Sequence, residues 1–347
     1  MKAVVVREPG PIEAMVLEEV ADPVAGPKDV LVKVEACGVC YHEIVTRNGT
    51  FRSGVKMPLI LGHEISGEVV EVGSEVPDFK PGDRVAAAQR YHVCGYCTHC
   101  RSGREPLCDE QKFLGDYGMV GGYAEYVAIE HDNLAHVPAE VSLAQASIVS
   151  CAVGTVLNAI REVGRLHLGE RVLVTGAGGG LGMHAIQLAR LAGAYVVAAT
   201  SSPGKAARMR ELGADAVVEF KRGEDFSAEV LDVTGGEGCS VAIDNVGTPL
   251  FHPTRRSLAR GGRWLLIGQL TGDFVPFNPA QLFLKDISML SALSTTRRQL
   301  IDCLEFVARG QVQPIVSESF PLSQVHEAHR RVEEGSVAGR LLLRPGM

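Results

Sequence analysis

Short apolar runs separated by turn residues dominate the first 150 positions. Residues 4–6, 30–35 and 66–72 are rich in β-branched side chains, and glycine and proline punctuate the chain, as at 81–83. Runs of this kind are typical of β-strands bounded by turns. The pattern predicts a β-rich N-terminal part that has no fixed-period repeat and no low-complexity linker.

After about residue 150, strand-like and helix-like segments alternate. The predicted strands are 171–174, 195–199, 216–218, 241–244 and 263–268, and the predicted helices between them include 184–191 and 205–212. Such alternation indicates a parallel sheet with right-handed crossovers. The last 50 residues begin with a predicted helix over 297–309 and end in an apolar strand over 340–343.

The composition is that of a globular protein. The chain has 347 residues, 46% of them hydrophobic and 22% charged, which suggests about two domains and excludes a disordered or collagen-like chain. A formal net charge of −7 argues against nonspecific nucleic-acid binding. No apolar run has the roughly 18–20 residues of a membrane helix, and the N-terminus is no signal peptide. We therefore expect a cytoplasmic protein without a membrane partner.

Four of the nine cysteines lie close together in the segment 94–108. They are spaced C-x2-C-x2-C-x7-C and are Cys94, Cys97, Cys100 and Cys108. Four thiolates at this spacing can surround one tetrahedral zinc ion, which would be structural because no ligand position stays open. An iron–sulfur cluster is the alternative, but the ferredoxin run needs a shorter last spacer followed by proline. We expect His92 and His99 to be bystanders.

A second set of metal-binding residue types is spread over a longer stretch. Cys40 follows a predicted strand, His63 and Glu64 come some twenty residues later, and Cys151 lies much further on. A single buried cysteine or histidine is usually a packing residue. A Cys, His and Cys set would instead leave a fourth position for water or substrate, as in catalytic zinc sites. Spacing alone leaves both interpretations open.

A glycine-rich turn between a predicted strand and a helix indicates a dinucleotide site, since glycines let the backbone approach a pyrophosphate at a helix N-terminus. The turn contains Gly176, Ala177, Gly178, Gly179, Gly180, Leu181 and Gly182. NAD-specific folds place an acidic residue at the end of the next strand. Here that strand ends in Thr200, Ser201 and Ser202, and Lys205 follows. This favours NADP, with Arg208 as a possible helper, and leaves NAD as the alternative.

These motifs, in this order, resemble those of zinc-dependent members of the medium-chain dehydrogenase/reductase superfamily, the alcohol dehydrogenase family, over essentially the whole chain. The resemblance implies an α/β fold: a doubly wound, parallel Rossmann sheet combined with a GroES-like distorted β-barrel. The catalytic domain would comprise residues 1–152, with the zinc lobe at 94–108, and the C-terminal return 296–347. The cofactor domain would comprise residues 153–295, and the site would lie in the cleft between domains.

The resemblance also assigns site residues. It implies that Cys40, His63 and Cys151 bind a catalytic zinc, so that each subunit holds two zinc ions, with Glu64 behind the ligands or binding transiently. Arg340 matches a late arginine near Glu64 and the cofactor phosphates. The glycine register is Ala177-x-Gly179-x-x-Gly182. The remaining cofactor residues would be Thr155, Gly176, Gly180, Leu181, Thr200, Ser201, Ser202, Lys205, Asp244, Gly268 and the stretch 291–294.

The sequence departs from the family two residues after the first cysteine. Serine or threonine usually relays the substrate proton there, whereas this chain has His42, followed by Glu43 where aspartate is common. A histidine can carry a proton near neutral pH; the alternative is a simple wall residue, beside Tyr41, Phe51 and Leu270. The Cys-Tyr-basic-acidic pattern also resembles zinc-type acryloyl-CoA reductases.

The predicted activity is zinc-dependent hydride transfer between NADP, or NAD, and an alcohol or its aldehyde or ketone. The first alternative is reduction of an activated C=C bond, as in acryloyl-CoA. The second is a dinucleotide-binding protein without activity, which the complete Cys40, His63 and Cys151 set disfavours. A zinc hydrolase would leave the nucleotide fold without a use. We expect a small-molecule substrate and a homo-oligomer, a tetramer or a dimer.

Overall fold

The computed structural model describes residues 1–50 and 54–347, so that Phe51, expected in the substrate pocket, lies outside the described residues. The chain separates into two compact units. The first unit comprises Met1–Gly154 and Ser294–Met347, and the second comprises Thr155–Leu293. These limits lie within two residues of the expected domain boundaries, and the C-terminal segment returns to the first unit.

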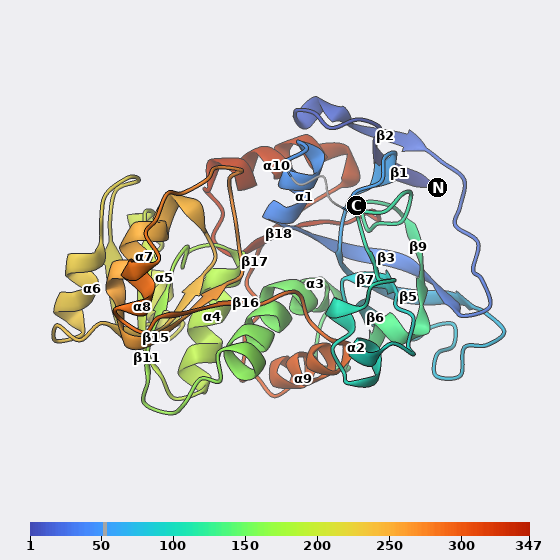
Figure 1. Ribbon diagram of the computed structural model, residues 1–347. Coiled ribbons are helices and arrows are strands. Elements are labelled where there is room, and N and C mark those ends of the chain that lie inside the picture. The colour runs from blue at the N-terminus through green and yellow to red at the C-terminus, as the bar shows by residue number, and fades with distance from the viewer. Residues whose placement is uncertain (51–53) are drawn as a thin grey trace. The chain divides into compact units, whose positions relative to one another are not determined.

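The largest sheet of the first unit has seven strands (Figure 1). Its path is β10 (Leu134–His136), β6 (Arg84–Ala87), β5 (Glu64–Val72), β3 (Asp29–Val39), β18 (Arg340–Leu343) and β17 (Val316–Phe320), and β9 (Tyr126–Glu130) also pairs with β3. Strand β3 has eleven residues, so that β9 pairs with its first half and β18 with its last three residues, while β5 takes the other edge. This arrangement brings the last strand of the chain beside the end of β3.

Two smaller sheets complete the first unit. The three-stranded sheet joins β2 (Met15–Glu19), β1 (Lys2–Val6) and β4 (Leu59–Ile60), and the two-stranded sheet joins β7 (Arg90–His92) and β8 (Lys112–Phe113). Buried valine, isoleucine and leucine side chains from β1, β3, β4, β5 and β18 form one core cluster. Each such side chain contributes about 1.5–3 kcal/mol to stability on burial.

The second unit contains a six-stranded parallel sheet. Its order is β13 (Ala216–Glu219), β12 (Tyr195–Thr200), β11 (Arg171–Val174), β14 (Cys239–Asp244), β15 (Leu258–Leu266) and β16 (Ser288–Ser291). The chain builds outward from β11 to β13 and then restarts on the other side at β14. This is the doubly wound order with a switch point between β11 and β14, and it confirms the expected fold class.

The predicted helices are present, and the structure contains several short helices that were not predicted. The first unit has α1 (Tyr41–Arg47), α2 (Thr98–Arg101), α3 (Leu143–Ile148), α9 (Arg297–Ala308) and α10 (Val325–Glu334). The second has α4 (Gly180–Leu191), α5 (Ala206–Glu211), α6 (Ser227–Val233), α7 (Phe251–Ser257) and α8 (Ala280–Phe283). The helices predicted over 184–191, 205–212 and 297–309 correspond to α4, α5 and α9.

One helical stretch corrects an expectation about apolar segments. Within the described residues, Leu143–Val163 is long and apolar enough to cross a membrane, with a mean hydropathy of 1.6. Polar residues interrupt its apolar runs, so no continuous run of that length is visible in the sequence. The buried share of its most apolar window is 78%, as in the core helix of a soluble protein, so the segment is weak evidence for a membrane span.

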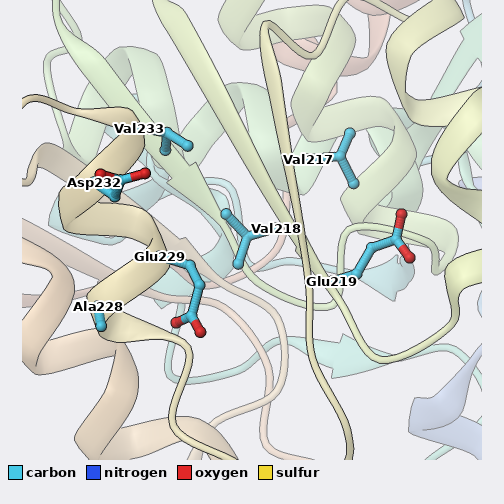
Figure 2. A pocket seen from close by; sticks show the side chains of 7 residues that line it. All are labelled: Val217, Val218, Glu219, Ala228, Glu229, Asp232 and Val233. Carbon is cyan, nitrogen blue, oxygen red and sulfur yellow. The ribbon is translucent and has the colours of Figure 1, made fainter.

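An acidic groove of about 490 Å³ lies beside β13, the edge strand of the parallel sheet (Figure 2). It is lined by Val217, Val218, Glu219, Ala228, Glu229, Asp232 and Val233, from β13 and α6. None of these is an expected site residue. Three carboxylates make the groove unsuitable for an anionic nucleotide.

Candidate active site

Four predicted metal-binding residues come together in the first unit. The ligand atoms of Cys40, His63, Glu64 and Cys151 all lie within 4.8 Å of one another, and all four residues are buried. Cys40 follows β3 at the start of α1, and His63 and Glu64 stand where β5 begins. Antiparallel pairing of β3 with β5 sets these ends side by side, and Cys151 arrives on a π-helical turn, Val149–Thr155.

Glu43 supports two members of this cluster at once. Its Oε2 accepts a hydrogen bond of 2.9 Å from the backbone N–H of Cys40, and its Oε1 is bonded to Nδ1 of His63. A carboxylate on one ring nitrogen fixes the tautomer of a histidine and leaves the other nitrogen for a metal. From the sequence, Glu43 stood out only as a departure from the family pattern. Its position three residues into a helix after an N-cap was the signal for this role.

Glu64 and Arg340 form a buried ion pair beneath the sulfur ligands. Nη2 of Arg340 lies 2.8 Å from Oε1 of Glu64, 3.1 Å from Sγ of Cys40 and 3.6 Å from Sγ of Cys151. Burial raises the pKa of Glu64 to about 7, although the guanidinium opposes this shift. Gly38 makes room for the pair, because a Cβ there would lie 2.1 Å from Oε2 of Glu64. The structure thus places Arg340, expected near Glu64 and the cofactor phosphates, beside Glu64 and the two cysteine sulfurs.

The donor set of this cluster fits zinc. A hydrogen bond with Cys151 and the charge of Arg340 lower the pKa of the Cys40 thiol well below its usual range, which favours the thiolate needed for metal binding. Two sulfurs and one imidazole nitrogen are the ligands of an open zinc site, and Glu64 is close enough to be an alternative fourth ligand. Soft sulfur donors of this kind disfavour magnesium or calcium.

His42 lies beside the cluster and is held by residues that the sequence did not indicate. Its ring centroid is 5.1 Å from that of His63 and 5.1 Å from that of Phe113. Its Nε2 lies 2.9 and 3.0 Å from the two carboxylate oxygens of Asp116. Burial lowers the pKa of His42, but Asp116 outweighs this effect and the pKa is raised overall. No sequence signal links positions 42 and 116, since 74 residues separate them.

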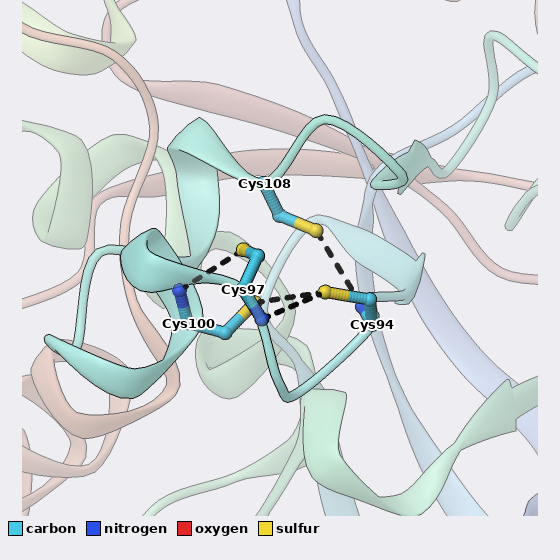
Figure 3. Close-up of side chains that lie close together, drawn as sticks. All are labelled: Cys94, Cys97, Cys100 and Cys108. Carbon is cyan, nitrogen blue, oxygen red and sulfur yellow. Dashed lines mark hydrogen bonds between the residues drawn. The ribbon is translucent and has the colours of Figure 1, made fainter.

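The four cysteines of the predicted zinc lobe also converge (Figure 3). The sulfurs of Cys94, Cys97, Cys100 and Cys108 lie within 4.8 Å of one another, and those of Cys94 and Cys100 are 3.9 Å apart. Tetrahedral zinc with Zn–S bonds of about 2.3 Å separates its sulfurs by about 3.8 Å. Backbone N–H groups also donate to three of the sulfurs, at 3.4–3.5 Å. The spacing fits a single metal ion with four thiolate ligands.

In the second unit, the glycine-rich turn leads into the N-terminus of α4, with Gly179 at the N-cap. A Cβ on Gly182 would lie 2.3 Å from the carbonyl oxygen of Gly176, so only glycine allows this packing. Lys205 crosses the turn: a Cβ on Gly178 would lie 2.7 Å from its Cδ. The hydroxyl of Thr155 is buried and has no hydrogen-bond partner in the described part of the chain. The tight turn and the ammonium beside it fit a dinucleotide phosphate chain. Thr155 belongs to the same unit, and its unsatisfied hydroxyl can accept a further polar partner.

Asp244 stands apart from the other expected cofactor residues. It is fully buried, and its Oδ1 accepts hydrogen bonds from Thr175, Val246 and Gly247 at 2.7–3.1 Å. Its Oδ2 accepts from Nε1 of Trp264 at 3.0 Å. The carboxylate is closed to a ligand in this structure, and it ties together the ends of β11, β14 and β15. Gly268 donates its backbone N–H to the carbonyl oxygen of Asp244 at 3.1 Å.

Fold and site together define a zinc-binding dehydrogenase. Residues 26–139 match the family model of the alcohol dehydrogenase GroES-like domain, and residues 180–309 match that of the zinc-binding dehydrogenase. The chain belongs to the zinc-type medium-chain dehydrogenase/reductase superfamily, as the sequence motifs indicated. It is an oxidoreductase of the alcohol dehydrogenase type.

Individual relatives fall into two functional groups. An acryloyl-coenzyme A reductase of Sulfurisphaera tokodaii is 33% identical over 99% of this chain and 100% of its own length. An alcohol dehydrogenase of Geobacillus stearothermophilus is 36% identical over 99% of both chains. Among solved structures, the crystal structure of AibC is 42% identical, with a TM-score of 0.90 over 99% of this chain and 95% of AibC.

Proposed function

We propose that this chain is a zinc-dependent NAD(P)(H) oxidoreductase that interconverts alcohols with aldehydes or ketones. The observation that carries the proposal is the buried cluster of Cys40, His63 and Cys151 with Glu64. Its two sulfurs and one nitrogen match an open zinc site, and the second unit supplies a dinucleotide turn. A hydrolase would need the metal site alone.

The residues of the chain divide the work of catalysis. Zinc would supply Lewis acidity toward the substrate oxygen, and nicotinamide would supply or accept the hydride. Cys40, His63 and Cys151 would hold the metal, and Glu43 orients His63 through its Nδ1. His42, which stands beside His63, would pass the proton between the substrate oxygen and solvent.

Replacement of Cys40 tests the proposal. Cys40→Ser removes one thiolate, so turnover of an aldehyde with NADPH should fall by about 10³-fold or more, because the metal is lost or loses its geometry. Quenching of protein fluorescence by NADPH should persist, since the dinucleotide turn lies in the second unit. Cys303→Ser is the matched control, because Cys303 is a buried cysteine of α9 that belongs to neither group of predicted metal ligands. Wild-type turnover by Cys40→Ser would exclude the zinc mechanism.

NADP is the cofactor that we propose. No acidic residue ends β12, Ser202 donates its backbone N–H to the hydroxyl of Thr200 at 3.0 Å, and Lys205 crosses the glycine turn. Arg222 is close enough to Lys205 that its charge, together with burial, lowers the pKa of the Lys205 ammonium. Two cations near the turn suit a 2′-phosphate. One relative of known structure is bound to NADP, while another is named an NAD-dependent alcohol dehydrogenase. We also propose two zinc ions per subunit, a tetrameric or dimeric assembly and a cytoplasmic location.

Reduction of the C=C bond of a coenzyme A thioester is the second candidate. Relatives at 33% and 35% identity are named acryloyl-coenzyme A reductases. The ammonium groups of Lys56 and Lys112 lie 5.0 and 5.4 Å from the ring of Tyr117, and neither forms an ion pair among the described residues. Phe113 and Asp116 contact His42 beside the metal-binding cluster. Lys112 directly precedes Phe113, and Lys56 lies over the ring of Tyr117, which directly follows Asp116, so both cations are near this part of the site. They could attract the phosphates of a coenzyme A substrate.

The lysine pair gives this second candidate its own test. If coenzyme A thioesters are substrates, Lys56→Ala with Lys112→Ala should raise KM for crotonyl-CoA about tenfold and leave KM for uncharged crotonaldehyde unchanged. Lys80→Ala, an exposed lysine on another loop, serves as the control. No turnover of crotonyl-CoA by the wild type would remove this candidate.

A further inference from the structure

The carboxylate of Asp116 is the main partner of the His42 side chain in the candidate active site. Both of its oxygens lie within 3.0 Å of Nε2, and the hydroxyl of Thr46 donates to Oδ1 of Asp116 at 3.1 Å. The side chains of His42 and Asp116 are only 27% and 16% exposed, so the pair is largely shielded from water. Shielding strengthens such a charged hydrogen bond.

The ring of His42 is restrained on its faces as well. It stands nearly perpendicular to His63, at 78°, and is tilted by 54° to Phe113. Phe113 packs in turn on His63, with ring centroids 5.2 Å apart. The two aromatic neighbours limit where the ring lies, and Asp116 holds its Nε2. A carboxylate on Nε2 keeps a proton there in the neutral ring and in the imidazolium alike, so Nδ1 is the nitrogen at which the ring gains or loses a proton.

The side chain of Asp116 is not needed to hold its own loop. The backbone carbonyl of Asp116 accepts from the N–H of Lys56 at 2.8 Å, and the N–H of Gly118 donates to the carbonyl of Lys56 at 2.9 Å. These backbone bonds fix the loop whatever side chain stands at 116. A partly buried carboxylate that its backbone does not require is most simply explained by its partner, His42.

We propose that Asp116 is a positioning residue for His42: it fixes the ring with the proton on Nε2, in the orientation that turnover at the neighbouring metal site requires. The inference rests on the proposed function, because it assigns His42 a place in the reaction. It adds Asp116, which is 74 residues from His42 in the sequence, to the residues that turnover requires. A wall residue of the pocket would not need such a partner. Thr46 assists by holding the carboxylate from α1.

A double-mutant cycle tests the proposal on the full-length, zinc-replete protein. Turnover of crotonaldehyde with NADPH is measured for the wild type, Asp116→Asn, His42→Ala and the double variant, with zinc content and NADPH quenching recorded for each. Asp116→Asn keeps the shape of the side chain and removes its charge. We expect kcat to fall at least tenfold in Asp116→Asn, with KM changed less than twofold and with wild-type zinc content and quenching. In the His42→Ala background, the same change should alter kcat less than twofold.

The other outcomes contradict the proposal in distinguishable ways. Wild-type kcat in Asp116→Asn, or equal effects of that change with and without His42, would overturn the positioning role. Wild-type kcat in His42→Ala would also overturn the positioning role. This result tests the proposal even if the Asp116→Asn variant does not fold. If the wild type itself turned over no carbonyl or alcohol, the proposed function would fail first. Thr46→Val, which removes the hydroxyl that lies 3.1 Å from Oδ1 of Asp116 and 3.4 Å from Nε2 of His42, should lower kcat by a smaller factor than Asp116→Asn.

Discussion

Glu43 links the backbone of one metal-binding residue to the ring of another. Its two oxygens accept from the N–H of Cys40 and bind Nδ1 of His63, so one side chain orders both. The residue is buried, and water cannot replace it. Loss of the carboxylate charge should therefore lower the affinity for zinc more than it lowers the stability of the fold.

Replacing Glu43 should weaken zinc binding. In Glu43→Gln the carboxylate no longer holds the tautomer of His63, and loss of such a partner typically lowers metal affinity by about 10–100-fold. Competition with a chromogenic chelator measures this affinity. Glu35→Gln is the control, since Glu35 on β3 pairs with Arg344 and is not a member of the cluster. Identical zinc dissociation in Glu43→Gln and wild type would contradict the assigned role.

Sequence predicted the ligands of the site but not their surroundings. Cys40, His63, Glu64 and Cys151 carry metal-binding side chains in a recognisable order, and the structure brings them together. Asp116 and Phe113 could not be found in this way, because only the folding of a distant loop places them at His42. The hydrogen bonds of Asp244 to Thr175 and Trp264 could not be predicted either, because the burial of this carboxylate is a property of the packed sheet.

At the scale of elements, α1 and α10 are joined by a buried histidine. Nη1 of Arg47 donates to Nδ1 of His329 at 3.1 Å, and Nε2 of His329 lies 3.1 Å from the hydroxyl of Tyr123. Burial, together with the charges of Arg47 and His326, lowers the pKa of His329 to about 3. The histidine is therefore neutral in the folded protein.

This histidine should make stability fall in mild acid. Unfolded histidine titrates near pH 6.5, so between about pH 3 and 6.5 the unfolded chain binds more protons and unfolding is favoured as the pH drops. The contribution is about 2 kcal/mol between pH 7 and pH 5. Urea denaturation at both values, for wild type and His329→Gln, measures it, and the variant should lose this part of the difference. Equal pH dependence of the two proteins would show that His329 is not responsible.

The strands that sequence predicted are those with apolar, β-branched runs. Strands β3, β5, β11, β12, β13, β14 and β18 have such runs. The short β7 and β8 and the serine-bounded β16 have too few apolar residues to stand out. Strand β15 begins at Leu258, five residues before the predicted start at 263. The prediction began too late because the first half of the strand contains two glycines, which resemble a turn. The π-helical turn at Cys151 has no local signal and follows from packing.

On the scale of the whole molecule, the sequence pattern predicted a β-rich part followed by a parallel α/β part, and the family resemblance implied the late return of the chain to the first unit. Alternating strands and helices leave few topologies for the second unit, which explains this success. Substrate identity could not be predicted, since the wall residues come from separate loops. The relatives of this chain differ in substrate in the same way, since some are named alcohol dehydrogenases and others acryloyl-coenzyme A reductases.

Cofactor choice is a property that one surface lysine should reveal. Lys205 lies against the glycine turn and is half buried. If it binds a 2′-phosphate, Lys205→Ala should raise KM for NADPH about tenfold and leave KM for NADH nearly unchanged. Arg210→Ala is the control, because Arg210 is an exposed residue on α5 to which no cofactor role is assigned. Steady-state kinetics with both cofactors decide, and equal changes in the two KM values would show that Lys205 does not bind a 2′-phosphate.

The central claim is carbonyl chemistry at the Cys40, His63 and Cys151 site, and one reaction tests it most directly. Crotonaldehyde offers both a C=O and a C=C bond, so zinc-replete protein is incubated with crotonaldehyde and NADPH and the product is identified by gas chromatography. The proposed function predicts crotyl alcohol. Butanal would contradict it and would assign the chain to the reductases of activated alkenes.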